Sequence, residues 1–263
     1  MIFFSTHCWQ LGHELGVDEG LAEFTRQANL DLRHTNEDVL PCVKVLFMLR
    51  QSFPVQVWVD PGSSRIAESR CRAFHDFLHS SQCHTWVTCD DDVECDLTTL
   101  SYLLSAVDVR EPVICSAPYW CRLTKGQEPR ISVQLPRSPL VVPIPGGGQM
   151  VRMLRGGFGL VAMNRAAAIA VQEGCKIAQL DYTDTHGVTR TAPFLETIVD
   201  RFWRGEDIAF FERMPSFVDK MALCKGFTRH AGQVLDLRLL VDGPATLQEV
   251  KDAHLDTTRE PHA

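Results

Sequence analysis

The chain of 263 residues carries a formal net charge of −7, and 45% of its residues are hydrophobic, enough to bury the core of one large domain. No stretch approaches the roughly 20 apolar residues that a membrane-spanning helix needs, and the first residues lack the charged start of a signal peptide. The ten cysteines include no Cys-x-x-Cys pair, which argues against a zinc cluster and favours reduced, buried thiols. These features predict a soluble, cytoplasmic protein with no membrane association.

The first half of the chain alternates short β-rich runs with amphipathic helices. Strands are predicted for residues 2–6, 55–59, 87–89 and 112–117. One helix is predicted to begin at Ser64 and another at the capping residue Asp96. The inner face of the second helix is expected to hold four apolar residues, Leu97, Leu100, Leu104 and Val107. This alternation predicts an α/β fold with a mainly parallel sheet flanked by helices, and such sheets bind ligands at the carboxyl ends of their strands.

The most informative motif is the triplet Asp90-Asp91-Asp92, which follows the strand at 87–89. Adjacent carboxylates repel one another, so a cation is one way to neutralise them. In an extended chain residues i and i+2 lie on the same side, which predicts that Asp90 and Asp92 converge on one ion while Asp91 points away. A solvated acidic turn that caps the next helix is the alternative.

The second half of the chain is less regular. Strands are predicted for 131–135 and 140–144, followed by a loop at 145–148 that is either a lid or a simple hairpin connection. The glycines of Arg155-Gly156-Gly157-Phe158-Gly159 would allow a ligand to approach the backbone closely. A helix is predicted to begin at Asn164 and end at Gly174.

A second acidic pair, Glu206-Asp207, follows Gly205. Apolar spacing predicts an amphipathic helix over 194–202 that Gly205 terminates, so the two acids would begin a new helix. They are either a complement to the helix dipole or a general base held at the edge of a site. Downstream, a strand over 217–224 leads to Arg229-His230-Ala231-Gly232, in which His230 is a candidate metal or phosphate ligand.

Charge is distributed unevenly along the chain. Residues 119–165 contain seven cationic side chains against the single acid Glu128, so this segment could face a polyanion. The residues 14–38 and the tail after 236 are acidic.

The order of these motifs resembles the GT-A-fold glycosyltransferases, in particular compact family-two-like and Anp1-like members from bacteria and phages. The resemblance spans residues 55–232 and rests on Ala67-Glu68-Ser69-Arg70, Asp90-Asp91-Asp92-Val93, Gly157-Phe158-Gly159-Leu160, Gly205-Glu206-Asp207-Ile208 and His230-Ala231-Gly232. Two departures leave the donor sugar open: Cys71 stands where an asparagine is common after the arginine, and Gly156-Gly157-Phe158 replaces the more usual Gly-Thr-Gly-Phe.

The resemblance implies a Rossmann-like nucleotide-binding half at 1–118, an acceptor-side half with a smaller mixed or antiparallel sheet at 119–235, and a partly disordered extension at 236–263. It implies that Mn²⁺ or Mg²⁺ is held by Asp92 and His230, with Asp90 at the ribose or a metal-bound water. The remaining donor contacts would come from Thr6, Arg70, Asp91, Gly157, Phe158 and Arg229. Asp207 would remove the acceptor proton, with Glu206 as the second candidate.

These features lead us to expect a metal-dependent transferase that moves a sugar from a nucleotide diphosphate sugar, with a UDP-sugar favoured, to an acceptor hydroxyl. The acceptor, retention or inversion, and the oligomeric state stay open, and a hydroxymethylated base in phage DNA is one alternative for the acceptor. A nucleotidyltransferase on a related fold and a non-enzymatic polyanion-binding protein are the alternatives to glycosyl transfer.

Overall fold

The computed structural model describes residues 1–7, 14–33, 39–60, 65–121, 130–183, 187–199, 201–230, 233–238 and 240. Several positions that carried predictions lie outside these ranges. They are the predicted helix start at Ser64, the charged residues Arg122, Lys125 and Glu128, the pair Ala231-Gly232, and the acidic extension from residue 241 onward.

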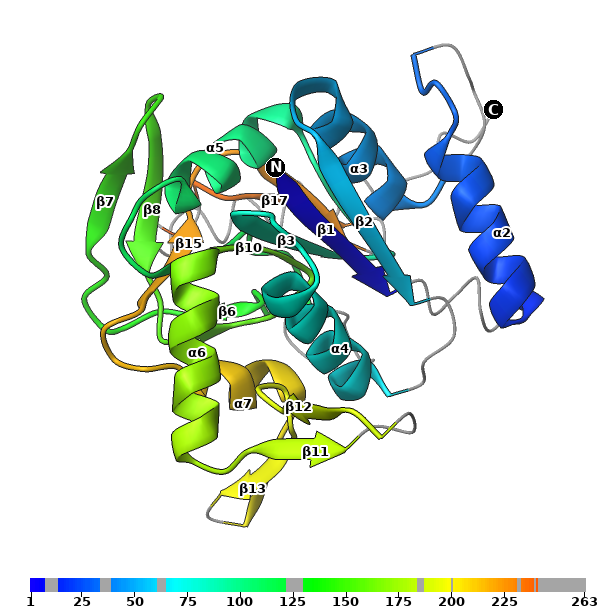
Figure 1. The fold of residues 1–263 in the computed structure, drawn as a ribbon. Coiled ribbons are helices and arrows are strands. Elements are labelled where there is room, and N and C mark those ends of the chain that lie inside the picture. The colour runs from blue at the N-terminus through cyan, green and yellow to red at the C-terminus, as the bar shows by residue number, and fades with distance from the viewer. Residues whose placement is uncertain are drawn as a thin grey trace.

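An eight-stranded sheet with the order β2-β1-β3-β10-β5-β15-β8-β7 forms the centre of the molecule (Figure 1). Its strands are β1 (Ile2–His7), β2 (Val55–Asp60), β3 (Thr85–Asp90), β5 (Val113–Ser116), β7 (Val141–Ile144), β8 (Gly148–Arg152), β10 (Leu160–Asn164) and β15 (Asp219–Leu223). Strand β1 pairs in parallel with β2 and β3, and β5 with β15, whereas β10 and β8 run antiparallel to their neighbours. Most strands therefore point the same way, as the sequence predicted.

Helices cover both faces of this sheet (Figure 1). One face carries α3 (Pro41–Ser52) and α5 (Leu97–Val107), with α2 (Val17–Ala28) packed beside α3. The other face carries α4 (Ile66–His79), α6 (Arg165–Ile177) and α7 (Glu206–Arg213). The predicted α/β class, a large sheet flanked by helices, is confirmed.

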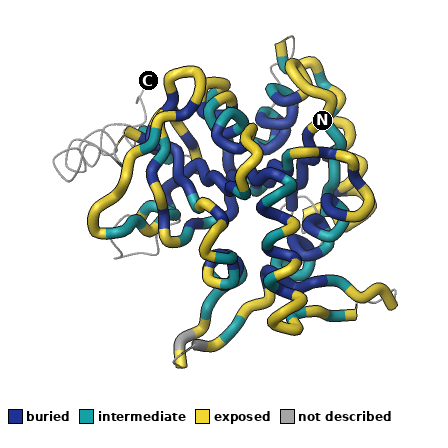
Figure 2. The backbone as a smooth tube through the Cα atoms, turned by 60° about the vertical axis from the view of Figure 1, so that its left-hand side comes forward, coloured by how far each residue is buried: buried dark blue, intermediate teal, exposed yellow. Residues whose placement is uncertain are grey.

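The central strands are apolar on both sides because both sides are covered. Along β1, Ile2 and Phe4 face the core under α3 and α5, and Phe3 faces the core under α4 and α6. Figure 2 shows the buried segments in the middle of the molecule and most exposed segments at its periphery. Both faces of the sheet are thus used by the core, and functional side chains are expected where the strands end.

Short antiparallel pairs surround the main sheet. They are a three-stranded sheet of β4 (Val93–Cys95), β16 (Phe227–His230) and β17 (Gln233–Asp236), and the ribbons β6 (Val133–Gln134) with β9 (Arg155–Gly156), β11 (Asp181–Thr183) with β12 (Thr189–Thr191), and β13 (Thr197–Val199) with β14 (Phe202–Arg204). The smaller antiparallel sheet that we expected is present, although β4 comes from the first half of the chain.

Three local predictions were wrong. Residues 194–202 contain no helix: strand β13 begins at Thr197 and pairs with β14, which leads into α7. Helix α6 runs past Gly174 to Ile177, because Gly174 does not adopt the left-handed backbone conformation of a helix-ending glycine. Leu97 is 61% exposed, and the buried face of α5 uses Leu103 instead.

Other local predictions are confirmed. Asp96 caps α5 by accepting a hydrogen bond from the Thr99 backbone N–H, and Asn164 caps α6 in the same way through Ala167. The segment at 145–148 is a hairpin connection between β7 and β8. Among the described helices, none has the length and apolar character to cross a membrane.

Candidate functional site

Three strand ends place polar side chains side by side at the carboxyl edge of the sheet. His7 ends β1 and lies in register with Asp60 at the end of β2 and with Asp90 at the end of β3. The two residues before each end are buried, Ser5 and Thr6 in β1 and Thr88 and Cys89 in β3, so the ionisable side chains begin at this edge. This is the edge at which sheets of this kind bind ligands.

Helix α4 delivers a buried guanidinium to this edge. The Arg70 side chain is 2% exposed and contacts three carboxylates that come from two distant segments. Its Nη2 donates to Asp90 Oδ1 at 3.0 Å, and its Nη1 donates to Glu206 Oε1 at 3.0 Å and to Asp207 Oδ1. Burial alone lowers the pKa of Arg70, but the three carboxylates outweigh it and raise the pKa, so the guanidinium is permanently charged.

Asp207 is held from two sides. One carboxylate oxygen binds Arg70, and the other accepts a hydrogen bond from the Phe158 backbone N–H at 3.2 Å. Burial raises the pKa of Asp207 to about 6, and Glu206 and Asp90 add to this effect while Arg70 opposes it. A carboxyl group with this pKa takes up and releases protons near neutral pH, as a general base must.

Asp92 and His230 form a second group next to the acids. Nδ1 of His230 lies 2.6 Å from the Trp120 carbonyl oxygen, and Nε2 lies 3.1 Å from Asp92 Oδ2. A carbonyl only accepts, so Nδ1 carries a proton, and a neutral ring would then turn the lone pair of Nε2 toward a carboxylate oxygen. A proton shared between Nε2 and the carboxylate, or a cation bound by both groups, would remove this repulsion.

The geometry of this pair fits a divalent metal ion. Ligand atoms on adjacent positions of an octahedral ion, with bonds of about 2.1 Å, lie about 3 Å apart, close to the distance from Nε2 to Oδ2. A backbone carbonyl that accepts from the other ring nitrogen is also the usual support for a metal-binding histidine. Within the described ranges, however, no group of three His, Cys, Asp or Glu side chains is arranged to hold a metal, so protein ligands alone would leave its coordination incomplete.

Tyr119 lies between the two groups, and the sequence analysis did not identify it. Its ring centroid is 4.9 Å from that of His230, and Asp90 and Asp207 are close enough to contribute, after burial, to the raised pKa of its hydroxyl. A Cβ atom added at Gly157 would collide with this hydroxyl, and one added at Gly159 would collide with the ring. We expected these glycines to leave room for a ligand, but at Gly157 and Gly159 the Tyr119 side chain occupies that room.

A further set of polar side chains surrounds His7. Nδ1 of His7 lies 2.8 Å from Ser69 Oγ, and this hydroxyl donates to Asp60, which also pairs with Arg72 at 2.6 Å. Burial lowers the pKa of His7 to about 4, with Arg70 the second cause, so its ring is neutral at pH 7. Nε2 of His7 is buried and has no hydrogen-bond partner in the described part of the chain.

The structure separates several residues that we expected to act together. Asp90 and Asp92 do not lie on one side of a strand, because β3 ends at Asp90 and the next two residues form a turn. Asp90 faces Arg70, Asp92 faces His230, and Asp91 belongs to the turn between them. The prediction of an ion shared by Asp90 and Asp92 assumed an extended geometry that this turn does not have.

Three predicted donor contacts are placed differently from our expectation. Arg229 points to the opposite face of β16 from His230 and pairs with Glu94 at 2.8 Å. The Phe158 ring is fully buried against Phe194 and Phe210, so its backbone rather than its side chain serves the site. Thr6 is buried within β1, one residue before the edge.

The basic segment at 119–165 does not form one cationic face in its described part. Arg165 donates to the backbone carbonyls of Phe77, Leu78 and Cys83, so it is a structural residue. Arg152 pairs with Asp219, and Arg155 pairs with Glu212. These contacts use the positive charges of Arg152, Arg155 and Arg165 within the protein, so they give little support to a polyanion-binding face.

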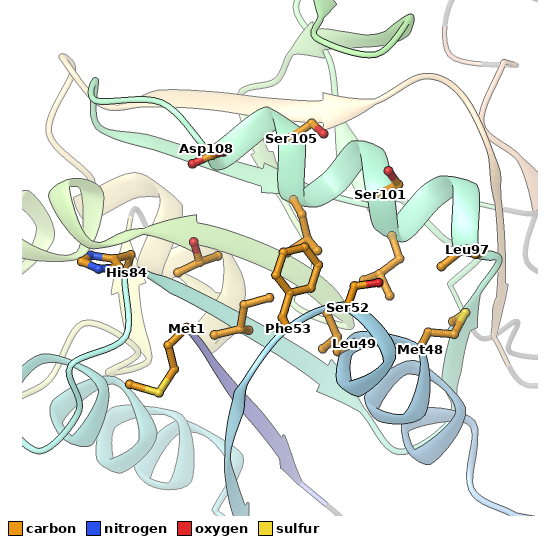
Figure 3. A pocket seen from close by; sticks show the side chains of 14 residues that line it. Met1, Met48, Leu49, Ser52, Phe53, His84, Leu97, Ser101, Ser105 and Asp108 are labelled. Carbon is orange, nitrogen blue, oxygen red and sulfur yellow. The ribbon is translucent and has the colours of Figure 1, made fainter. Parts of the chain in front are cut away.

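A cavity of about 510 Å³ lies at the opposite end of the strands, where β1 and β3 begin, between α3 and α5 (Figure 3). Its wall includes Met1 and His84, which precede strands β1 and β3, together with Leu49 and Phe53. None of the acids described above lines it. We therefore place the candidate site at the carboxyl edge, where the ionisable side chains converge.

No protein-family model matches this sequence, and no curated protein matches it. Among solved structures, the crystal structure of A197 from STIV is similar to this chain, with a TM-score of 0.42 and 12% sequence identity. The similarity covers 90% of this chain and 90% of that one. A likeness of this strength indicates nothing about activity or substrate.

Proposed function

We propose that this chain is a metal-dependent glycosyltransferase that moves a sugar from a nucleotide diphosphate sugar, a UDP-sugar in our preference, to an acceptor hydroxyl. The observation that carries the proposal is the convergence of Arg70, Asp90, Glu206 and Asp207 beside the Asp92–His230 pair at the carboxyl edge of the sheet. These segments are far apart in the sequence, and the GT-A resemblance rests on the same segments.

Asp92 and His230 would hold Mn²⁺ or Mg²⁺, and the phosphates of the donor would complete its coordination. When bound, this ion supplies Lewis-acid stabilisation of the departing diphosphate. The Trp120 carbonyl and the Tyr119 ring hold the His230 imidazole with its Nε2 toward Asp92, the orientation in which the two groups would hold the ion. His7, at the end of β1, would lie beside the nucleoside.

Asp207 would accept the proton of the acceptor hydroxyl. Its pKa of about 6 leaves it mostly ionised at pH 7 and still basic enough to take a proton. Arg70 and the Phe158 backbone N–H fix the orientation of the carboxylate. Arg70 in this arrangement positions the acids; direct contact with a phosphate stays a prediction.

A thermal-shift screen of nucleotide sugars, with and without Mn²⁺, tests the proposal, followed by identification of the released product. We expect stabilisation by one class of nucleotide sugar only when Mn²⁺ is present, and slow release of a nucleoside diphosphate. Release of pyrophosphate would instead establish a nucleotidyltransferase. No metal-dependent shift with any nucleotide would reject both and favour a binding protein.

A further inference from the structure

Tyr119 comes from the carboxyl edge of the sheet, on the segment that follows β5. Strands β3 and β5 both run antiparallel to β10, so they end at the same edge. The Tyr119 ring lies 4.9 Å from the His230 ring, measured between centroids, and the carbonyl oxygen of the next residue, Trp120, lies 2.6 Å from Nδ1 of His230. Two consecutive residues thus contact the histidine of the Asp92–His230 pair.

The other end of the Tyr119 side chain lies beside the acids. A Cβ atom added at Gly157 would collide with the Tyr119 hydroxyl, so this oxygen lies directly against the backbone of Gly157. The next residue is Phe158, whose backbone N–H donates to Asp207 at 3.2 Å. Asp90 and Asp207 are both close enough to affect the hydroxyl electrostatically. The side chain therefore reaches from the proposed metal ligands to the proposed base.

Tyr119 is fixed by its backbone as well as by its ring. Its N–H donates to Ser132 Oγ at 3.0 Å, and its carbonyl accepts from the Ser132 N–H at 2.9 Å. The Ser132 carbonyl in turn accepts from the Gly157 N–H at 2.6 Å. These bonds fix both the tyrosine and the glycine that it contacts, so the position of the hydroxyl is set before any ligand binds.

The Tyr119 hydroxyl is available for a hydrogen bond to a ligand. Tyr119 is 9% exposed, and its hydroxyl forms no hydrogen bond with the part of the chain that the structure describes. Unlike Nε2 of His7, this oxygen is not sealed from solvent. Burial, followed by the charges of Asp90 and Asp207, raises the pKa of the phenol well above its usual value, so the group is neutral and can both donate and accept.

The proposed reaction places the transferred sugar beside this hydroxyl. The anomeric carbon is joined to the diphosphate, which would lie at the ion held by Asp92 and His230. The same carbon is attacked by the acceptor oxygen, whose proton Asp207 would take. The sugar must therefore occupy the space between these two groups. Tyr119 contacts the first group and lies next to the second, so its hydroxyl faces that space.

The acids give this space a negative character. The side chains of Asp90, Glu206 and Asp207 are between 20% and 25% exposed, whereas the Arg70 side chain that offsets part of their charge is 2% exposed. A molecule that enters from solvent therefore meets three carboxylates before it meets the guanidinium. These carboxylates repel a carboxylate on the sugar but accept hydrogen bonds from sugar hydroxyl groups.

We propose that the Tyr119 hydroxyl forms a hydrogen bond with a hydroxyl group of the transferred sugar and thereby selects the donor, and that this sugar is neutral rather than a uronate. The inference rests on the proposed function, in which Asp207 remains the base. Tyr119 is then a donor-binding residue that contacts the sugar and leaves the nucleotide to other side chains.

Tyr119→Phe removes only the hydroxyl and tests this role. Calorimetry with Mn²⁺ measures UDP binding, and UDP release without acceptor measures the use of UDP-glucose, UDP-galactose and UDP-N-acetylglucosamine. We expect UDP binding to stay within about twofold of wild type, and kcat/KM for the best of these donors to fall about tenfold. An unchanged kcat/KM, or an equal weakening of UDP binding and of donor use, would overturn the proposal.

A control variant and deoxy sugars identify the hydrogen bond. Tyr102→Phe makes the same chemical change on α5, beside Gly148 and Lys225, and should change neither value. Among deoxy analogues of the best donor, one should be used about tenfold less by wild type, with no further loss in Tyr119→Phe. A full tenfold loss from Tyr119→Phe with every analogue would show that no sugar hydroxyl is its partner.

UDP-glucuronate tests the charge of the sugar, because it differs from UDP-glucose only by a carboxylate in place of the hydroxymethyl group. We expect kcat/KM to be at least about tenfold lower for UDP-glucuronate than for UDP-glucose. Equal use of the two donors, or use of UDP-glucuronate and of none of the neutral donors, would contradict the assignment of a neutral sugar.

The same measurements separate failure of this inference from failure of the proposed function. If the wild type does not bind UDP with Mn²⁺, the proposed function fails and the role of Tyr119 fails with it. If the wild type binds UDP but releases it from none of the neutral donors, or releases it equally well without the Tyr119 hydroxyl, the role of Tyr119 is wrong and the nucleotide site stands.

Discussion

Arg70 and Asp207 are 137 residues apart in the sequence, and the guanidinium of the first donates directly to the carboxylate of the second inside the protein. The same guanidinium binds Asp90 and Glu206. One buried cation therefore joins the helix α4, the end of β3 and the start of α7. The positive charge of Arg70 offsets the repulsion among these carboxylates from different segments.

Removal of the Arg70 guanidinium should destabilise the folded protein. Arg70→Met leaves three partly buried carboxylates without their partner, and we expect the free energy of unfolding to fall by about 3–5 kcal/mol. Urea denaturation at pH 7 measures it. Arg152→Met is the matched control: its pair with Asp219 is exposed, so the loss should stay below about 1 kcal/mol. Equal losses in the two variants would contradict a special role for Arg70.

Activity should depend on pH through Asp207. Because an ionised carboxylate is needed to accept a proton, kcat/KM should fall about tenfold per unit below pH 6 and be constant above it. Glu206→Gln removes a negative charge that raises the pKa of Asp207, so the acidic limb should move to lower pH while activity persists. Asp207→Asn should remove nearly all transfer. If Glu206→Gln abolished activity and Asp207→Asn kept it, the two roles would be reversed.

The close packing of Tyr119 against Gly157 can be tested by substituting both residues. Gly157→Ala places a methyl group against the Tyr119 hydroxyl, and overpacking of this kind costs about 1–3 kcal/mol. Tyr119→Phe in the same chain removes that hydroxyl and leaves contacts of 3.2 Å, so most of the stability should return.

Thermal denaturation of the single and double variants measures this coupling. Gly174→Ala is the control, because its new methyl group would meet neighbours only at 3.5 Å or more, and alanine favours the interior of α6. We expect it to be neutral or stabilising. Additive losses from Gly157→Ala and Tyr119→Phe would show that the two residues do not restrict each other.

Protonation of His7 should lower the free energy of unfolding as the pH falls below about 6.5. Its pKa is about 4 in the folded protein and about 6.5 when unfolded, so the unfolded chain binds more protons between these values. This contribution to stability is complete above pH 6.5 and is lost as the pH falls toward 4, by roughly 3 kcal/mol. Asp207, whose pKa is raised, acts in the opposite direction over part of that range.

The comparison with a variant isolates the contribution of His7. Unfolding free energies of the wild type and His7→Gln are measured from pH 7 to pH 4. The stability difference between them should change by the amount given above, because the contribution of Asp207 is common to both. A constant difference across this range would show that His7 is not buried in its neutral form.

The sequence predicted those parts of the fold that depend on local signals. The caps Asp96 and Asn164 and the start of α7 after Gly205 are visible because a short polar residue or a glycine stands before an apolar periodic run. Strands β1, β3 and β5 are visible as short runs rich in β-branched and aromatic residues, whereas the buried strand β10 was not predicted. These signals were sufficient for the α/β class and for the edge of the sheet where the acids lie.

Features that depend on tertiary contacts were missed. Leu195 and Ile198 have helical spacing, but the chain around Ile198 is a ribbon with Ile198 opposite Trp203. Strand alternation could not predict that Asp91 and Asp92 form a turn, nor that Arg70 would contact three carboxylates. Nothing in the sequence near Tyr119 indicated that its ring fills the space above Gly157 and Gly159.

The most direct test of the central claim is calorimetry of UDP binding in the presence and absence of Mn²⁺. We expect wild-type protein to bind UDP only with Mn²⁺, and Asp92→Asn and His230→Gln each to weaken that binding at least tenfold, because each removes one ligand of the ion. Asp219→Asn, whose carboxylate is exposed and far along the sheet, should bind as the wild type does. UDP binding that is independent of Mn²⁺, or that Asp92→Asn and His230→Gln leave unchanged, would contradict the claim that this pair holds the metal of a nucleotide-sugar site.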